Sequence, residues 1–335
     1  MKKGKLLLAA ILTLALSGAG LAAKVFITIG SGSTTGVYYP VAVGIAKLIN
    51  TYLSDEGIRA NARSTGGSVY NALAIAKGEL QMTMIQNDVA YYAYTGTVRE
   101  EFKGKPVKKL RGLATLYPEP VQIIARTDSG IRRIPDMKGK KVYVGDVGSG
   151  VEVNSRQIFE AYGMTFDDLG QAVRGRANQA AQLLQDGRID ALIYTAGLGT
   201  ATIAQPALTT DIVFVPIDLD KIQYLMEKYP FYSQFIIPAG YYSGKPKVSV
   251  PTVTVKATLA ASADLPEEVV YKIMKLLFDE KFDEFKKIHS NLEKYFSLDK
   301  ALEGMSIPLH PGAVKFYQEK GIEVPEKLLP PEMKQ

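Results

Sequence analysis

The sequence repeats one local pattern, in which a short β-rich run is followed by a loop of small polar residues and then by a helical stretch. The pattern occurs in two blocks and predicts strands at residues 25–29, 59–64 and 80–85, and then at 141–144, 172–174, 189–194 and 212–215. Strands that alternate with helical stretches of roughly 10–15 residues are typical of parallel sheets in α/β proteins. The chain is therefore predicted to be an α/β protein with two such sheets.

Two longer β-rich runs, residues 111–126 and 248–260, join the blocks. We interpret them as extended crossovers between two lobes, with a bend at the two prolines of the first run and with the second lobe inserted into the first. A chain of 335 residues is long enough for two domains that each bury a core. The predicted division is 24–118 with 252–335 for the first lobe and 119–251 for the second.

The first 23 residues have the three-part pattern of a secretory signal peptide. Lys2, Lys3 and Lys5 precede an apolar run at residues 6–16, and small residues follow. This apolar run is shorter than the roughly 20 residues that a membrane-spanning helix needs. We expect cleavage near Ala22 or Ala23 and a mature protein in the periplasm, with a retained membrane anchor as the alternative.

The composition excludes several kinds of chemistry. There is no cysteine, so disulfides, thiolate metal sites and a cysteine nucleophile are absent. The two histidines, His289 and His310, both lie near the C-terminus, which disfavours a histidine metal site or a serine–histidine–aspartate triad. Loss of three lysines with the signal peptide lowers the net charge of +6 by half. Such a mild charge does not favour nucleic acid as a partner, and no cofactor or metal is expected.

Three loops, at residues 30–36, 64–68 and 145–150, follow predicted strands and precede predicted helices. Ligands of open α/β sheets bind at the carboxyl ends of strands, close to the N-termini of helices. Free backbone N–H groups and the helix dipole attract anions there. Each loop alone is equally consistent with an ordinary turn, but three of them in two lobes indicate a carboxylate site in a cleft.

The first loop falls short of a nucleotide-binding motif. Gly30, Gly32 and Gly36 are spaced one residue off the dinucleotide fingerprint, and Ser64 stands where that motif needs an acidic residue. Tyrosines lie in or beside the loops, and we expect Tyr38 and Tyr117 to cover a small polar ligand. Half-buried positions in the core are the ordinary alternative for them.

Longer segments add a family resemblance. They are IGSGSTTGVYYPVAVGIAKLIN (29–50), STGGSVYNALAIAKGELQMTMIQNDVAYYAYTG (64–96), LATLYPEPVQIIAR (113–126), VGSGVEVNSRQIFEAYG (147–163), DGRIDALIYTAG (186–197) and IPLHPGAVKFY (307–317). These segments resemble the TAXI family, the solute-binding proteins of tripartite ATP-independent periplasmic (TRAP) transporters. The resemblance covers nearly the whole mature chain. It implies a two-lobed periplasmic-binding-protein type II fold that captures glutamate or a related amino or oxo acid for a TRAP permease driven by an ion gradient.

The loops and the resemblance together predict a ligand site that closes by a hinge motion, with no catalytic residue. The first lobe is expected to contribute Ser31, Thr34, Thr35, Gly36, Thr65 and Ser68, and the second Ser149, Glu152, Asn154 and Thr195. Tyr38, Asn87 and Tyr117 would complete the wall, and Glu119 would pair with an ammonium group of the ligand.

Two other functions stay open at this point. A periplasmic ligand sensor would keep the ligand and replace the permease with a signalling partner, and neighbouring genes for membrane subunits would discriminate the two. A periplasmic enzyme is less favoured and would show turnover. The residues do not distinguish glutamate from 2-oxoglutarate or succinate as the ligand.

Overall fold

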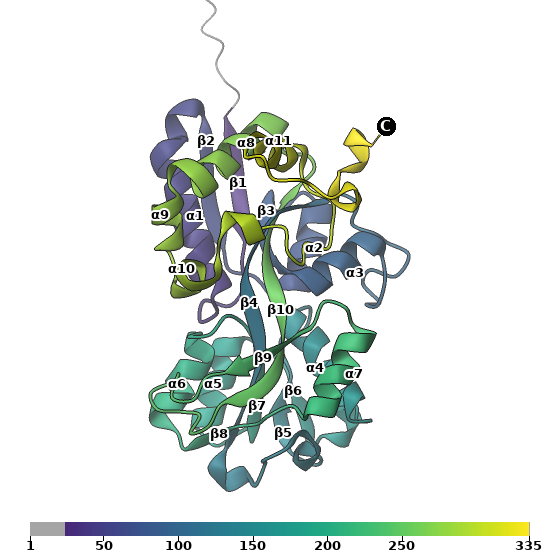
Figure 1. Ribbon diagram of the computed structural model, residues 1–335. Helices are drawn as coiled ribbons and strands as arrows, with labels where there is room; N and C mark the ends of the chain where they lie inside the picture. Colours follow the sequence, from purple (N-terminus) through teal and green to yellow (C-terminus); the bar gives the residue numbers. More distant parts are fainter. Residues whose placement is uncertain (1–23, 335) are drawn as a thin grey trace, which may run out of the picture.

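The computed structural model describes residues 24–334, which form two lobes joined by two long strands (Figure 1). The predicted signal peptide at residues 1–23 lies outside the described residues. Among the described residues, no helix is long and apolar enough to cross a membrane.

The first lobe contains three parallel strands, with β1 between the other two. These strands are β1 (Val25–Gly30), β2 (Ile58–Arg63) and β3 (Met82–Gln86). Helices that follow the strands or come from the C-terminal part of the chain surround them: α1 (Tyr38–Tyr52), α2 (Ser68–Ala76), α3 (Asn87–Thr95), α8 (Glu267–Lys275), α9 (Phe282–Lys286), α10 (Ser290–Tyr295) and α11 (Pro311–Glu319). Helix α1 buries Val41, Ile45 and Ile49, whose spacing places them on one helical face against the core.

The second lobe repeats this arrangement. Strand β5 (Lys141–Tyr143) pairs in parallel with β6 (Gln171–Val173) and β7 (Ala191–Thr195). The lobe also contains the antiparallel strands β8 (Ile212–Phe214) and β9 (Ser233–Ile237). Its helices are α4 (Gly150–Ala161), α5 (Ala177–Gln185), α6 (Ala201–Thr209) and α7 (Leu219–Lys228).

Strands β4 (Leu110–Arg126) and β10 (Val250–Ser262) run through both lobes as an antiparallel pair. In the first lobe β10 also pairs with β3, and in the second lobe β4 also pairs with β7 and β8. The sheets are therefore mixed, not purely parallel, because the crossovers themselves are central strands. The predicted lobe boundaries fall inside these two strands, and that division stays a prediction.

Some local features were not predicted from the sequence. Helix α6 contains Pro206, although a proline inside a helical stretch normally signals its end. Helices α8 and α9 are separated by a π-helical turn, Leu276–Glu280. Both histidines cap helices outside the ligand pocket described below, where their Nδ1 atoms accept hydrogen bonds from the N–H groups of Asn291 and Gly312.

Candidate functional site

A cavity of about 410 Å³ lies between the lobes, beside β4. Its walls come from residues at or just after the carboxyl ends of β1, β2, β3, β5, β6 and β7, together with Glu119 of β4. All three loops singled out by the sequence contribute to it. The volume suits a small organic ligand. We call this cavity the ligand pocket.

Four helices begin at the ligand pocket. Lining residues include Tyr38 at the start of α1, Ser68 of α2, Gly150 of α4 and Ala177 of α5. The first N–H groups of a helix have no partner within the helix, and the helix dipole makes this end partly positive. The arrangement therefore favours an anionic group such as a carboxylate.

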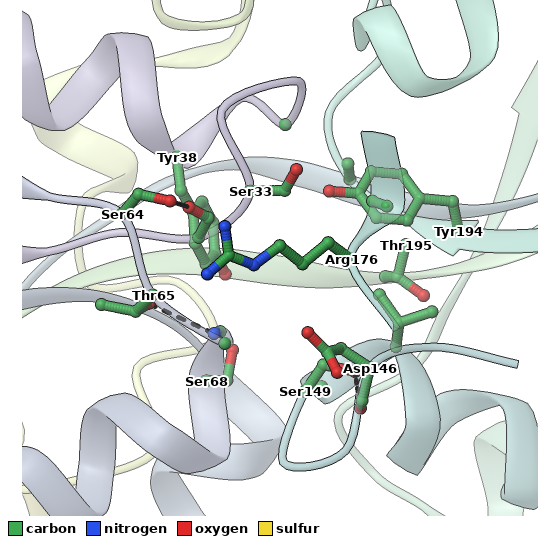
Figure 2. Close-up of a pocket in the computed structure, with 18 of the residues that line it drawn as sticks. Ser33, Tyr38, Ser64, Thr65, Ser68, Asp146, Ser149, Arg176, Tyr194 and Thr195 are labelled. Carbon is green, nitrogen blue, oxygen red and sulfur yellow. Dashed lines mark hydrogen bonds between the residues drawn. The ribbon is translucent and has the colours of Figure 1, made fainter. Parts of the chain in front are cut away.

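Two arginines strengthen this positive character. Arg63 lies at the end of β2 and donates a hydrogen bond to the Tyr70 hydroxyl at 3.1 Å. Arg176 directly precedes α5, and its side chain extends into the middle of the pocket, as Figure 2 shows. Burial raises the pKa of the nearby Asp146 carboxyl, and Arg176 opposes that rise. The lining thus combines two fixed cations with an acid that the guanidinium helps to keep ionised.

Glu119 supplies a buried acid on the β4 side. Its side chain is only 2% exposed, and its Oε2 atom accepts a hydrogen bond from the Tyr38 hydroxyl at 2.7 Å. Burial raises the pKa of Glu119 to about 8, partly opposed by the Tyr38 hydrogen bond, and the charge of Asp88 raises it further. At neutral pH the carboxyl is therefore mainly protonated, so a cationic group brought beside it would favour the ionised form.

Several buried polar atoms have no hydrogen-bond partner in the protein. They include Oε1 of Gln86 and Oγ1 of Thr195, both on residues that line the pocket. Buried polar atoms are nearly always paired, so these two atoms are exceptions among the residues of the pocket wall.

Hydrogen bonds beside the pocket join the two lobes. Thr35 of the first lobe accepts a hydrogen bond at its backbone oxygen from Thr200 Oγ1 at 2.9 Å, and its hydroxyl lies 2.9 Å from that of Thr202. The backbone N–H of Tyr70 donates to the backbone oxygen of Gly148 at 3.0 Å. The lobes are thus in contact around the pocket, in a closed arrangement.

Many of the predicted site residues line the pocket: Thr34, Gly36, Tyr38, Thr65, Ser68, Glu119, Ser149 and Thr195. The Ser149 hydroxyl caps α4, because it accepts from the N–H of Glu152 at 3.2 Å and donates to the backbone oxygen of Asp146 at 2.7 Å. A ligand beside Ser149 would therefore bind to backbone groups of this loop as well as to the hydroxyl.

The other first-lobe and β4 predictions lie outside the lining. The Ser31 hydroxyl donates to the backbone oxygen of Arg63 at 2.7 Å, and Thr35 contacts the opposite lobe. The Asn87 amide bridges the backbone of Gly304 and Lys256. Tyr117 is buried in the first-lobe core, two residues before Glu119 in the chain but outside the pocket wall.

Two predicted residues of α4 also lie outside the pocket wall. Glu152 is buried and forms ion pairs with Arg99, Arg156 and Arg174 at 2.8–3.3 Å. The buried Asn154 amide accepts a hydrogen bond from Gln86 Nε2 and donates one to Asp88 Oδ2, both at 3.0 Å. The side chains of both residues face neighbouring elements instead of the pocket.

The sequence reasoning missed lining residues that carry charge or amides, above all Arg63, Asp146, Arg176 and Gln86. It searched for small residues in loops, and these four have longer side chains. Their positions carried a usable signal, because each lies at or just after the end of a predicted strand.

The fold is that of the type II periplasmic binding proteins: two α/β lobes joined by two long strands, with the pocket between them. The chain belongs to the NMT1-like family, whose model matches residues 29–321.

Among solved structures, a protein from Bordetella bronchiseptica RB50 matches with a TM-score of 0.52 at 16% identity over 90% of each chain. An ABC uptake transporter substrate binding protein from Streptococcus pneumoniae with bound histidine matches at a TM-score of 0.49 and 16% identity, over 82% of this chain and 94% of that one. The alkanesulfonate-binding protein SsuA from Xanthomonas axonopodis pv. citri, bound to MOPS, matches at 0.48 and 12% identity, over 90% and 81%.

Proposed function

We propose that this protein is an exported solute-binding protein that captures a small carboxylate, glutamate or a related amino or oxo acid, and delivers it to a TRAP permease. The observation that carries the proposal is a pocket between the two lobes at which four helices begin and two arginines are present. A carboxylate bound there would contact both lobes and so stabilise the closed arrangement.

The residues that would hold the ligand follow from the pocket wall. Backbone N–H groups at the starts of α2 and α4, together with Arg176, would bind a carboxylate. Thr34, Thr65 and Thr195 would add hydroxyl contacts, and Glu119 would pair with an ammonium group where the ligand has one.

The TRAP partner and the periplasmic location rest on the TAXI resemblance and on the signal-peptide pattern. The match to the NMT1-like family does not by itself identify the protein as a TAXI protein or its partner as a TRAP permease. A transport assay addresses this step directly: proteoliposomes that contain a candidate pair of TRAP membrane subunits should take up labelled ligand only when this protein is added. Uptake that is independent of it would contradict the partnership.

Ligand capture is tested first by thermal unfolding of residues 24–335, after unfolding and refolding to remove carried-over ligand. The panel is glutamate, glutamine, 2-oxoglutarate, succinate and several apolar amino acids. A ligand at about 1,000 times its Kd adds about 4 kcal/mol to the free energy of unfolding, which is a clear rise in Tm. The Arg176→Met variant should lose most of that rise.

Arg188→Met is the matched control, because Arg188 is exposed and lies outside the pocket wall. It should behave as wild type. If no acid of the panel raises Tm, carboxylate capture is wrong. If Arg176→Met and Arg188→Met shift equally, the ligand binds elsewhere.

A further inference from the structure

A carboxyl group outside the ligand pocket is buried where the two lobes meet. Asp88, the second residue of α3, is only 1% exposed and does not line the pocket. Its Oδ2 atom accepts a hydrogen bond at 3.0 Å from Nδ2 of Asn154, which belongs to α4 of the other lobe. Its Oδ1 atom is buried and has no hydrogen-bond partner among the described residues.

The second lobe supplies groups that cover this carboxyl. The Asn154 amide also donates to the Tyr232 hydroxyl at 2.9 Å, and that hydroxyl donates to Gln157 Oε1 at 2.6 Å. Asn154 and Tyr232 are both buried, and Val153 of α4 packs into the hydrophobic core of the first lobe. Separation of the lobes would therefore take these groups away from Asp88 and let water reach its carboxyl.

No positive charge offsets the buried carboxylate in the closed arrangement. Among residues 24–334, Asp88 forms no ion pair. Arg99, which also reaches across to the second lobe, is paired with Glu101 and Glu152. Closure with Asp88 ionised therefore buries an uncompensated negative charge.

The titratable groups that face Asp88 are neutral or acidic. Tyr92 lies on the same helix and Tyr232 on the second lobe, and burial, followed by the charge of Asp88, raises the pKa of both hydroxyls. Glu119 of β4 is the remaining acid, and its pKa is raised mainly by burial and further by Asp88. Since the two tyrosines stay protonated below pH 8, only the two carboxyls change charge in the acidic range.

The energetic consequence depends on pH. Moving an ionised carboxyl from water into a buried site without a cation is costly, and protonation removes much of that cost. Burial accordingly raises the pKa of Asp88 from 3.8 to about 6, partly opposed by the Val89 N–H and by Asn154. With the lobes apart, water brings the pKa back toward its ordinary value. Protonation therefore favours the closed arrangement, and this gain is lost as the pH rises through about 6.

We propose that Asp88 is a pH-sensitive element of lobe closure: protonation of its carboxyl removes the charge that closure buries, so the protein captures its ligand more tightly in acid. Asp88 does not touch the ligand in this scheme and acts only on the equilibrium between the open and closed arrangements. The inference rests on the proposed function, because ligand binding is the event that closure accompanies.

The test compares the Kd of glutamate for the wild type and for Asp88→Asn by calorimetric titration at pH 5 to 7, with 2-oxoglutarate as a second probe. Asparagine keeps an oxygen that can accept from Asn154 and carries no charge. At pH 7 the variant should bind up to about 100-fold tighter, because a pKa raised from 3.8 to about 6 corresponds to roughly that factor. At pH 5 this advantage should be about tenfold smaller, because wild-type Asp88 is then mostly protonated on closure. Other titrating groups, Glu119 included, are common to both proteins and cancel in the ratio of the two Kd values.

Proton uptake gives an independent measurement. Glu119→Gln lacks the other buried acid, and its binding of glutamate at pH 5.5 should take up about 0.7 proton. The reason is that about three-quarters of closed molecules, and almost no open ones, carry the Asp88 proton at this pH. The slope of the binding enthalpy against the ionisation enthalpy of the buffer gives this number. Uptake should vanish in the double variant Glu119→Gln, Asp88→Asn.

Asp55→Asn, at an exposed position of the first lobe, is the matched control and should bind as wild type at every pH. A Kd ratio of wild type to Asp88→Asn that stays constant from pH 5 to pH 7 overturns the inference, because a merely structural aspartate changes affinity equally at every pH. Proton uptake near zero in Glu119→Gln also overturns it and leaves carboxylate capture standing. Failure of the wild type to bind either probe contradicts the proposed function itself. If Asp88→Asn fails to fold, the proton uptake of Glu119→Gln alone carries the test.

Discussion

Binding of an amino acid at neutral pH should release a proton from Glu119. The pKa of this buried carboxyl is about 8, so at pH 7 about nine-tenths of ligand-free molecules carry its proton. A ligand ammonium in contact with the carboxylate would lower that pKa by about 3 units, because an opposite charge favours ionisation, and the bound carboxyl is then almost fully ionised at pH 7. Binding should therefore release about 0.9 proton per ligand at pH 7, and ionising the carboxyl costs about 1.4 kcal/mol of binding free energy.

Calorimetric titrations in buffers of different ionisation enthalpy measure this number. The observed binding enthalpy changes linearly with the ionisation enthalpy of the buffer, and the slope is the number of protons released. At pH 8 the expected release falls to about 0.5, since half of the Glu119 carboxyls are already ionised. Asp88, with a pKa of about 6, is mostly ionised at pH 7 and contributes at most about 0.1.

Two variants test whether the released proton comes from Glu119. Glu119→Gln should bind without proton release, and Glu79→Gln, at an exposed position outside the pocket, should behave as wild type. Titration with 2-oxoglutarate should release almost no proton, because this ligand brings no ammonium group. A wild-type slope near zero with glutamate, or equal slopes for glutamate and 2-oxoglutarate, would refute the pairing of Glu119 with an ammonium.

Three further predictions concern stability and closure. The folded-state pKa of Glu119 lies above its ordinary value of 4.5, so its protonation stabilises the ligand-free fold below pH 4.5 and that stabilisation is lost as the pH rises through 8. Urea unfolding measures this: from pH 5.5 to pH 8 the free energy of unfolding of the wild type should fall by up to about 3 kcal/mol more than that of Glu119→Gln. Parallel pH profiles of the two proteins would contradict the prediction. Thr202→Val removes a hydroxyl contact to Thr35 across the lobes, so the Kd for the ligand should rise about 2- to 10-fold. Small-angle scattering should also report a larger ligand-free molecule. An unchanged Kd would mean that this contact does not stabilise the closed arrangement. Phe159→Ala leaves a cavity in the second-lobe core beside Phe166 and should lower the free energy of unfolding by about 3–5 kcal/mol, whereas a loss below 1 kcal/mol would mean that the site collapses.

The strand, loop and helix pattern was enough to predict the general position of the pocket. The loops at residues 30–36, 64–68 and 145–150 all reach it, because the carboxyl ends of parallel strands meet at one edge of a sheet. The pattern was not enough to predict side-chain direction. Ser31 and Gly32 are neighbours in one loop, yet Gly32 lines the pocket while the Ser31 hydroxyl turns to the backbone of Arg63.

The features of the site that the sequence did not predict depend on contacts between residues that are far apart in the chain. Glu119 differs from any other glutamate only because β10 and α1 bury it and bring Tyr38 to it, and those contacts join residues 81 positions apart. The orientation of the Gln86 amide depends on Asn154, Asp88 and Tyr232, which come from three separate segments in two lobes. Periodicity reports which face of an element is buried, and it does not report which polar groups meet there.

Helix α4 connects ligand capture with lobe closure. Its first residue, Gly150, lines the pocket, while Glu152, Asn154 and Gln157 contact Arg99, Asp88 and Tyr92 of the first lobe at 3.0–3.3 Å. A helix moves as a rigid unit, so a change in lobe angle that separates Gly150 from the first-lobe wall also strains or breaks these polar contacts. Buried polar groups are costly to leave unpaired, which makes intermediate angles unfavourable. We therefore expect closure to be close to two-state, with the ligand and the polar contacts of α4 stabilising the same closed arrangement.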